Sequence, residues 1–349
     1  MKSVQLLIAC IVTFVSVVTL AQSTTTIRLS STAPPNSLFD RVLKQMASEW
    51  HKATDGRVTL RVISGGATGD ESTIIRRMRL NNPQAAAITQ LGLAEIHDAF
   101  SVFGIPFFFE SDEELLHVLD RLTPELTDAL GERGLVLLGW GHTGWAHFFT
   151  AEPVRNLEDL RRTKIFTSAG DDVMVRWYKE NGFEPVPLAL TDVLMGLNTG
   201  LINAYPSPPY AALLFQWYRQ TPHMLDVALA PVIAATVMTE RSWRRLSEND
   251  RQAILKSAKG IQNQLWTEVP QQDREAVDAM SERGLTVATV SADEERAFRT
   301  MADEMTASWR GRIVPAEIFD AALRERDAFR AKRVALSVSP NTIPTQNFQ

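Results

Sequence analysis

A glycine-rich segment in the middle of the chain is the first candidate for chemistry. Gly139–Gly144 matches the G-x-G-x-x-G pattern of dinucleotide-binding turns, and Glu158 follows 19 residues after Gly139. In such turns the third glycine opens a helix whose N-terminal amides face the pyrophosphate. Residues 145–150 are aromatic and alternate like a strand instead. An NAD-dependent oxidoreductase that uses this turn is therefore kept only as an alternative.

The histidines form no metal-binding or catalytic pattern. His142 and His147 are five residues apart, so on one strand they would face opposite sides. The sequence also has no G-x-S-x-G elbow and no Walker loop, and its single cysteine is Cys10. We expect no catalytic residue, no metal and no cofactor. The six histidines are His51, His97, His117, His142, His147 and His223.

The first 21 residues have the form of an export signal. Lys2 supplies a positive start, Leu6–Leu20 is apolar, and small residues up to Ala21 suit cleavage. We therefore expect a periplasmic protein with residues 1–21 removed. Two alternatives are an uncleaved anchor, although the run is shorter than the ~20 residues of a spanning helix, and lipid attachment at Cys10. The formal net charge of −5 argues against a nucleic-acid partner.

Strands and helices alternate along the first part of the chain. Residues 24–30, 58–63 and 85–89 are predicted strands, and helices are predicted over 38–50 and 70–80. Asn36 or Ser37 would cap the first helix. This rhythm indicates an α/β fold with a mostly parallel sheet.

The later part is more helical. Strands are predicted at 135–140 and 145–150 around a glycine-rich turn, and a strand at 232–239 returns to the first domain. Ser247 would cap a helix over 248–266. The apolar residues 103–109 are predicted core under a loop. Helices are also predicted over 113–131, 171–181 and 191–199. Further helices are predicted after residue 266 and up to about residue 332, and residues 336–349 are predicted to be a disordered tail.

Several segments in a fixed order carry a resemblance to one family. They are Gly65-Gly66-Ala67-Thr68-Gly69, Ile105–Phe109, Leu157-Glu158-Asp159-Leu160 before Lys164-Ile165, Pro185-Val186-Pro187, and Leu197-Asn198-Thr199-Gly200. Over residues 25–335 the chain resembles the solute receptors of tripartite ATP-independent periplasmic (TRAP) transporters, of the dicarboxylate type. The resemblance implies two α/β lobes, each with a mixed and mostly parallel sheet, a long helix that braces both lobes, and a ligand between them. The expected lobes are 24–149 with 231–270, and 150–230 with 271–335.

The chain departs from the family pattern where the ligand would bind. Lys164-Ile165-Phe166 stands for the family's Lys-Ile-Arg, Ala146 replaces a second arginine, and Ser207 replaces an asparagine. An arginine fork makes charge-assisted bonds to a carboxylate, so we expect an apolar or aromatic ligand and not a simple dicarboxylate. Aromatic side chains would line its site, with Ser207 and Gln90 as hydrogen-bonding groups and Glu71 at the cleft mouth. The aromatic residues are Trp140, Trp145, Phe166, Tyr205 and Tyr210.

Two alternatives bear on this site. In the first, the aromatic side chains are core residues and do not contact a ligand. In the second, a neighbouring arginine restores a carboxylate anchor, and the candidates are Arg61, Arg162 and Arg176. The resemblance implies a periplasmic receptor that delivers its ligand to a membrane permease with a large and a small subunit. We expect a monomer without catalytic activity. A ligand sensor with the same fold is the other non-enzymatic alternative.

Overall fold

The computed structural model describes residues 24–338. The predicted signal segment 1–21, with Cys10, lies outside the described residues, and so does most of the predicted tail. The last helix runs to Val338, so the first three residues of that predicted tail are helical. None of the described helices is both long enough and apolar enough to cross a membrane.

Within the described residues, ten strands form one mixed sheet, which confirms the predicted α/β class. The main order is β2-β1-β3-β9-β4-β7-β5-β6, with β8 beside β4 and β10 beside β8. The strands are β1 (Thr25–Ser31), β2 (Val58–Ile63), β3 (Ala85–Thr89), β4 (Leu135–Thr150), β5 (Lys164–Ser168), β6 (Glu184–Leu188), β7 (Ala204–Ser207), β8 (His223–Leu225), β9 (Ala230–Thr239) and β10 (Thr286–Ala288). Pairing is parallel within β2-β1-β3 and within β7-β5-β6, and antiparallel along β3-β9-β4-β7.

Strand β4 joins the two ends of the sheet. It was predicted as two strands around a turn, but it is one strand of 16 residues that pairs with β9 along most of its length. Its ladder with β9 shifts register twice, between Leu137 and Gly139 and between His142 and Trp145. The prediction of a turn was wrong because the glycines here allow bulges and close approach to neighbours instead of ending the strand.

Helices cover the sheet and brace it. The helices are α1 (Leu38–Ala53), α2 (Glu71–Met78), α3 (Gln90–Ile96), α4 (Asp112–Gly131), α5 (Leu157–Arg161), α6 (Asp172–Glu180), α7 (Val193–Thr199), α8 (Pro209–Leu214), α9 (Glu240–Trp243), α10 (Glu248–Ser281), α11 (Ala292–Trp309) and α12 (Ala316–Val338). Among the described residues, the 3-10 helices are η1 (Asp98–Gly104), η2 (Leu190–Asp192) and η3 (Trp217–Arg219).

Two capping predictions are confirmed. The side chain of Ser37 accepts a hydrogen bond from the amide of Asp40 at the start of α1, and Ser247 does the same for Asp250 at the start of α10. Helix α10 is longer than predicted, with 34 residues, because it continues through Pro270. It packs on β4, α1 and α8, and thus braces both ends of the sheet.

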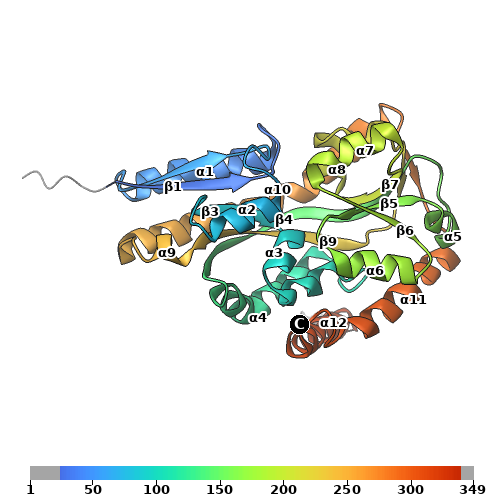
Figure 1. The fold of residues 1–349 in the computed structure, drawn as a ribbon. Helices are drawn as coiled ribbons and strands as arrows, with labels where there is room; N and C mark the ends of the chain where they lie inside the picture. Colours follow the sequence, from blue (N-terminus) through green and yellow to red (C-terminus); the bar gives the residue numbers. More distant parts are fainter. Residues whose placement is uncertain (1–23, 339–349) are drawn as a thin grey trace, which may run out of the picture.

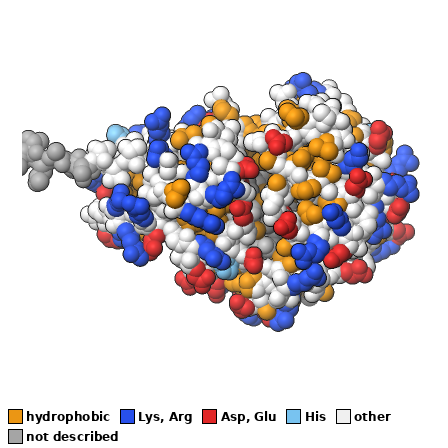
Figure 2. All heavy atoms as spheres, in the orientation of Figure 1, with side chains coloured by type: hydrophobic (Ala, Val, Ile, Leu, Met, Phe, Trp, Pro, Cys, Tyr) orange, Lys and Arg blue, Asp and Glu red, His pale blue; other side chains and the backbone are white. Residues whose placement is uncertain are grey.

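The molecule has two parts in Figure 1, with β1, α1 and α9 at one end and α5 and α7 at the other, and β4 and β9 pass between them. Helix α11 contacts α5, and α12 packs along α4, so the C-terminal helices also touch both parts (Figure 1). The surface is hollowed between the two parts (Figure 2). The residue at which one lobe ends and the other begins stays a prediction.

Candidate functional site

A cavity of about 680 Å³ lies between the two ends of the sheet. Its walls come from the start of α1, the β3–α3 junction, β4, β5, the start of α6, β7 and β9. Most of the side chains that line it are apolar, as is usual for pockets that hold small organic molecules. Among them are Phe39, Met46, Phe107, Phe148, Trp177 and Phe215.

The two positions at which an arginine was expected both line this cavity. Phe166 lies on β5 and Ala146 on β4, and both side chains are buried. Ser207 on β7 lines it as well, and its hydroxyl donates to the carbonyl of Pro208 at 3.1 Å. The structure therefore brings the three departures from the family pattern to one cavity wall.

Trp140 and Gln90 also line the cavity. The Trp140 ring packs against Phe100, and its indole N–H donates to the Thr123 hydroxyl at 2.9 Å. Only the apolar part of this side chain is thus open to a ligand. Gln90 is the first residue of α3 and is mostly buried.

Glu71 faces the cavity but is already engaged. Its carboxylate accepts hydrogen bonds from the Thr89 amide and hydroxyl, both at 2.8 Å, and from the Gly92 amide at 3.2 Å. Burial raises the pKa of Glu71. A Cβ at Gly92 would lie 2.6 Å from the Glu71 carboxylate, so a glycine is needed here. These contacts indicate that Glu71 fixes the junction of α2, β3 and α3.

Three predicted site residues are not among those that line the cavity, and they are Tyr205, Tyr210 and Trp145. Tyr205 is fully buried core, stacked on Phe149, and its phenol oxygen accepts from Thr221 at 3.1 Å. The Tyr210 phenol oxygen accepts from the Leu38 amide at 3.0 Å, which links α8 to the start of α1.

Trp145 lines a second pocket, of about 500 Å³, and donates from its indole N–H to Asp112 Oδ1 at 2.7 Å. For Trp145, Tyr205 and Tyr210, packing and hydrogen bonds within the protein account for the side chain, and we leave them out of the proposed site.

Cationic groups are scarce in the cavity. Among the described residues that line it, Arg312 is the only arginine or lysine, and it is exposed. Arg61, Arg162 and Arg176 are exposed and are not among the lining residues. The structure thus offers none of these three as a carboxylate anchor.

Carboxylates, in contrast, are frequent among the residues that line the cavity. Asp171 caps α6 by accepting from the Met174 amide at 3.0 Å, and burial raises its pKa. The lining carboxylates are Asp70, Glu71, Glu95, Asp98, Asp171 and Asp172. Together with the shortage of cations, they make the cavity a poor environment for an anion.

The glycine motif does not form a dinucleotide turn. Gly139–Gly144 lies inside β4, and residues 145–150 continue the strand, as predicted. No helix follows the third glycine, so the amides that would face a pyrophosphate are absent from this segment. Gly139 instead lies against α10, where an added Cβ would meet Ala258 at 3.3 Å.

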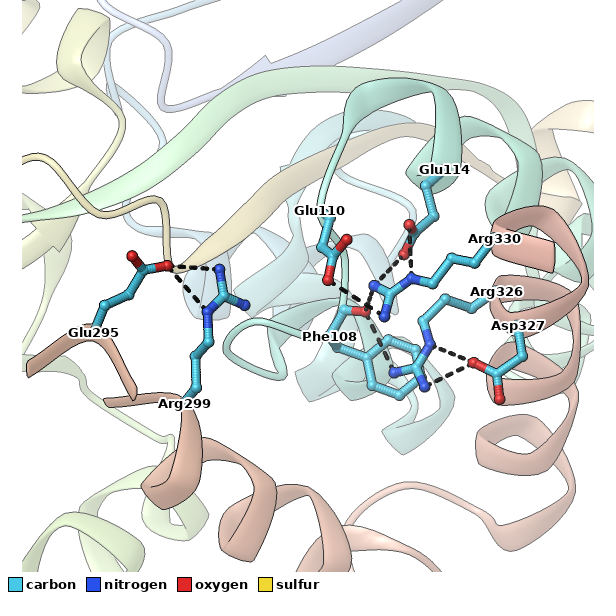
Figure 3. Close-up of polar contacts among 8 residues, drawn as sticks. All are labelled: Phe108, Glu110, Glu114, Glu295, Arg299, Arg326, Asp327 and Arg330. Carbon is cyan, nitrogen blue, oxygen red and sulfur yellow. Dashed lines mark hydrogen bonds and ion pairs between the residues drawn. The ribbon is translucent and has the colours of Figure 1, made fainter. Parts of the chain in front are cut away.

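The loop before α4 forms another part of the cavity wall, and residues of β9's approach segment and of the C-terminal helices α11 and α12 hold it in place. Phe107 has a left-handed backbone (φ 56°), its amide donates to the Leu229 carbonyl, and its ring lies 5.0 Å from the Arg299 guanidinium of α11. Two arginines of α12, Arg326 and Arg330, donate to the Phe108 carbonyl (Figure 3). The sequence gives no sign of this support, since the helices that supply it lie about 190 residues or more further along the chain.

Arg330 also pairs with carboxylates of the adjoining segment. It contacts the buried carboxylate of Glu114 at 2.8 Å and that of Glu110 at 3.4 Å, while Glu295 holds Arg299 at 2.9 Å (Figure 3). The cavity wall near Phe107 is therefore held by both C-terminal helices.

Two further lining residues, His142 on β4 and Thr167 on β5, were not predicted as site residues. Both are buried polar side chains. The sequence could not show that these side chains lack hydrogen-bond partners within the part of the chain that the structure describes. No group of three or more histidine, cysteine or acidic side chains in residues 24–338 is arranged to hold a metal ion.

Comparison with known proteins agrees with this architecture. The profile of bacterial extracellular solute-binding protein, family 7, matches residues 29–311. A solute-binding protein of Chromohalobacter salexigens is 28% identical over 255 residues, which cover 70% of this chain and 74% of that protein. A 2,3-diketo-L-gulonate-binding periplasmic protein of Escherichia coli is 23% identical over 241 residues, covering 68% of this chain and 72% of that protein.

Solved structures match over most of the chain. A TRAP periplasmic solute-binding protein from Chromohalobacter salexigens with bound D-glucuronate superposes with a TM-score of 0.80 at 22% identity, covering 86% of this chain and 99% of the other. A Bordetella pertussis extracytoplasmic solute receptor that binds pyroglutamic acid gives 0.80 at 20% identity, covering 87% and 100%. The predicted two-lobed fold is therefore confirmed.

Proposed function

The chain belongs to family 7 of the bacterial extracellular solute-binding proteins, and we propose that it is the solute receptor of a TRAP-type transporter. The cavity between the two parts of the molecule is its binding site. It would capture a small organic ligand there and deliver it to a membrane permease. Ligand contacts with both parts would favour the closed arrangement, because a ligand shifts a conformational equilibrium only through differential contacts.

We propose that this ligand is mainly apolar or aromatic and not a simple dicarboxylate. One observation carries the proposal: Phe166 and Ala146 line the cavity, and the only arginine or lysine among its described lining residues is the exposed Arg312. An arginine bond to a carboxylate contributes roughly 1.5–3 kcal/mol, and a buried carboxylate without a partner costs more. A closed cavity of this composition would therefore select against acids.

Several relatives and structural neighbours bind organic acids. The structures named above hold D-glucuronate and pyroglutamic acid, and another neighbour, from Advenella mimigardefordensis, is in complex with galactonate. Acid binding is thus the natural alternative for this chain. The apolar side chains of Phe166 and Ala146 are the reason that we propose a different ligand class.

Native mass spectrometry of the purified protein, followed by titration calorimetry, tests the ligand class. We expect a retained or added aromatic or otherwise apolar compound to bind, and D-glucuronate, galactonate and succinate to bind at least tenfold more weakly. Tight binding of any of these acids would contradict the proposal.

The proposal includes delivery to a permease with a large and a small membrane subunit. A ligand sensor with the same cavity is the alternative, and uptake separates the two. Cells that lack this chain should lose uptake of the labelled ligand and regain it when the chain is restored. Unchanged uptake together with an altered transcriptional response would favour the sensor.

We also propose that the chain catalyses no reaction and is a periplasmic monomer. The family description as solute-binding proteins and the continuation of β4 through the glycine motif support a receptor over an NAD-dependent oxidoreductase. Mixing the protein with NADH should leave the nicotinamide fluorescence unchanged. The intact mass of the protein from a periplasmic extract should correspond to a chain that starts after Ala21, and its mass in solution should be that of one chain.

A further inference from the structure

A partly buried carboxylate without a cation beside it lines the cavity. Asp171 lies at the start of α6, and its Oδ1 accepts a hydrogen bond from the Met174 amide at 3.0 Å. Its Oδ2 makes no hydrogen bond and no ion pair with residues 24–338. Burial raises the pKa of Asp171, and the neighbouring carboxylate of Asp172 adds to this effect. The described part of the chain therefore supplies no positive charge to this group.

The fully buried carboxylates of the described residues have different surroundings, because each has a cation beside it. The pairs are Asp40 with Lys44, Glu114 with Arg330 and Asp250 with Arg57. Glu71, which lines the same cavity as Asp171, accepts three hydrogen bonds instead. A carboxylate that leaves water without a partner destabilises the fold, so the exception at Asp171 calls for an explanation.

The phenol of Tyr178 lies near this carboxylate. Tyr178 is 9% exposed and lines the cavity together with Trp177 and Phe183, against which its ring packs. Its hydroxyl makes no hydrogen bond with residues 24–338, yet it is not among the unpaired atoms of this range that are closed off from solvent. Burial raises the pKa of Tyr178, and the charge of Asp171 adds to this effect. The phenol is therefore neutral, and its oxygen can accept a hydrogen bond.

The other part of the molecule adds negative charge to the cavity. Asp70, Glu95 and Asp98 line it from the segments around α2 and α3, whereas the only arginine or lysine among the described lining residues is the exposed Arg312. Like charges repel, so these carboxylates and Asp171 oppose closure of the empty cavity. A cation between the two parts would attract both and would favour the closed arrangement.

We propose that Asp171 and Tyr178 are ligand-binding residues that hold a protonated amine on a mainly apolar ligand. The inference rests on the proposed function and deepens it, because it names the polar group of the ligand. The ammonium group would donate hydrogen bonds to Asp171 Oδ2 and to the Tyr178 oxygen. Trp177 lines the cavity beside them and offers an aromatic face, which attracts cations.

Compounds that share a frame and differ in charge test the ligand class. At neutral pH, 2-phenylethylamine is a cation, 2-phenylethanol is uncharged and 3-phenylpropanoate is an anion, and their naphthyl counterparts provide a larger frame. Affinities would be measured by titration calorimetry. We expect the amine of at least one frame to bind about tenfold or more tightly than its alcohol, and the carboxylate to bind most weakly.

Asp171→Asn separates the charge from the fold. Asparagine also caps helices, so the Met174 amide keeps an acceptor while the negative charge is lost. This variant should weaken the amine by roughly 12-fold or more, the usual contribution of one hydrogen bond to a charged group, and leave the alcohol within about twofold. Asp278→Asn removes an exposed carboxylate of α10 that does not line the cavity, and it should change neither affinity.

Tyr178→Phe tests the second contact. Phenylalanine keeps a ring that can pack against Trp177 and Phe183, and only the hydroxyl is lost. The variant should weaken the amine by roughly 2- to 12-fold, the contribution of one neutral hydrogen bond. Its effect on the amine should therefore be smaller than that of Asp171→Asn.

Thermal unfolding without ligand gives a second readout. Asp171→Asn should leave the melting temperature unchanged or raise it, because no ion pair within residues 24–338 is lost and the repulsion among the lining carboxylates falls. Asp250→Asn is the matched control, since it breaks the pair with Arg57. It should lower the melting temperature by roughly 3 °C or more.

Three results would overturn the inference. One is that no amine binds more tightly than its alcohol, or that no amine binds; if the alcohols still bind more tightly than the carboxylates, the apolar cavity of the proposed function stands. Another is that Asp171→Asn weakens the amine no more than Asp278→Asn, or lowers the melting temperature as much as Asp250→Asn. The third is that a carboxylate binds most tightly, which would overturn the proposed ligand class as well.

Discussion

The amide of Tyr210 donates a hydrogen bond to Asp273 Oδ1 at 2.9 Å, which ties the start of α8 to the long helix α10. The amide of Trp145, on β4, donates to the same carboxyl group. Burial raises the pKa of Asp273 to about 7, and the two amides only partly offset this effect. Three elements thus meet at one titratable group.

This group should make stability depend on pH. Because the pKa of Asp273 is raised above its ordinary value of 3.8, the contribution of this carboxyl group to the stability of the fold is complete below about pH 4. That contribution is lost as the pH rises through about 7. Asp273→Asn removes the titration. The free energy of unfolding of Asp273→Asn relative to wild type should therefore rise between pH 4 and pH 8, by on the order of 2–4 kcal/mol.

Urea unfolding at several pH values measures this difference. Asp278→Asn, which removes an exposed carboxylate from the same helix, controls for the loss of one charge. A constant difference between Asp273→Asn and wild type over this pH range would contradict the prediction.

Gly144 should tolerate no side chain. Its φ is 109°, and an added Cβ would lie 2.2 Å from Asp273 Oδ2 and 2.9 Å from Pro208. Gly144→Ala should therefore lower the free energy of unfolding by about 2–4 kcal/mol. Gly260→Ala is the matched control, because it lies inside α10 with no atom within 4 Å of an added Cβ. It should stabilise the protein by roughly 0.5–1 kcal/mol; equal effects of the two variants in thermal or urea unfolding would refute this explanation.

An arginine at position 166 should restore acid binding. Phe166 lines the cavity on β5, in the place where the family pattern has an arginine. Phe166→Arg should raise the affinity for succinate or D-glucuronate at least tenfold, since one charge-assisted bond contributes roughly 1.5–3 kcal/mol. Titration calorimetry measures this change. Phe166→Met keeps an apolar side chain and should leave acid binding weak; no gain in a folded Phe166→Arg variant would show that this position does not contact the ligand.

Arg330 should matter more than Arg326 for stability. Arg330 pairs with Glu114, whose side chain is 2% exposed, whereas the partner of Arg326, Asp327, is 58% exposed. Arg330→Met would leave a buried carboxylate unpaired and should cost about 2–3 kcal/mol, while Arg326→Met should cost about 1 kcal/mol or less. The double variant Arg330→Met with Glu114→Leu should recover most of the loss in urea unfolding. If the double variant is as unstable as Arg330→Met, the loss of stability does not come from an unpaired Glu114 carboxylate.

The sequence predicted secondary structure correctly where the spacing of apolar residues clearly followed either the strand period or the helix period. The predicted strands over 58–63 and 85–89 match β2 and β3, and Ser37 and Ser247 cap the helices that they were predicted to cap. The sequence was misleading at β4, because glycines that often end a strand here give room to α10 and to Asp273. No local pattern distinguishes these two uses of glycine.

The candidate site could be predicted only in part. Phe166, Trp140, Ser207, Gln90 and Glu71 all line the cavity, and their contacts with a ligand remain a proposal. Tyr205 and Tyr210 resemble them in type, but their hydroxyls are engaged by Thr221 and Leu38, which are distant in sequence. Whether an aromatic side chain faces the core or a cavity depends on such long-range packing. Among residues 24–338, the ring nitrogens of His142 and the hydroxyl of Thr167 have no hydrogen-bond partner, and this is likewise visible only in three dimensions.

The two register shifts interrupt the ladder between β4 and β9, which are the strands that pass between the two parts of the molecule. Bulges of this kind bend a strand locally and leave fewer hydrogen bonds in the ladder at that point. If the two parts rotate against each other on ligand binding, as the proposed function requires, the ladder would oppose that rotation least at these two places.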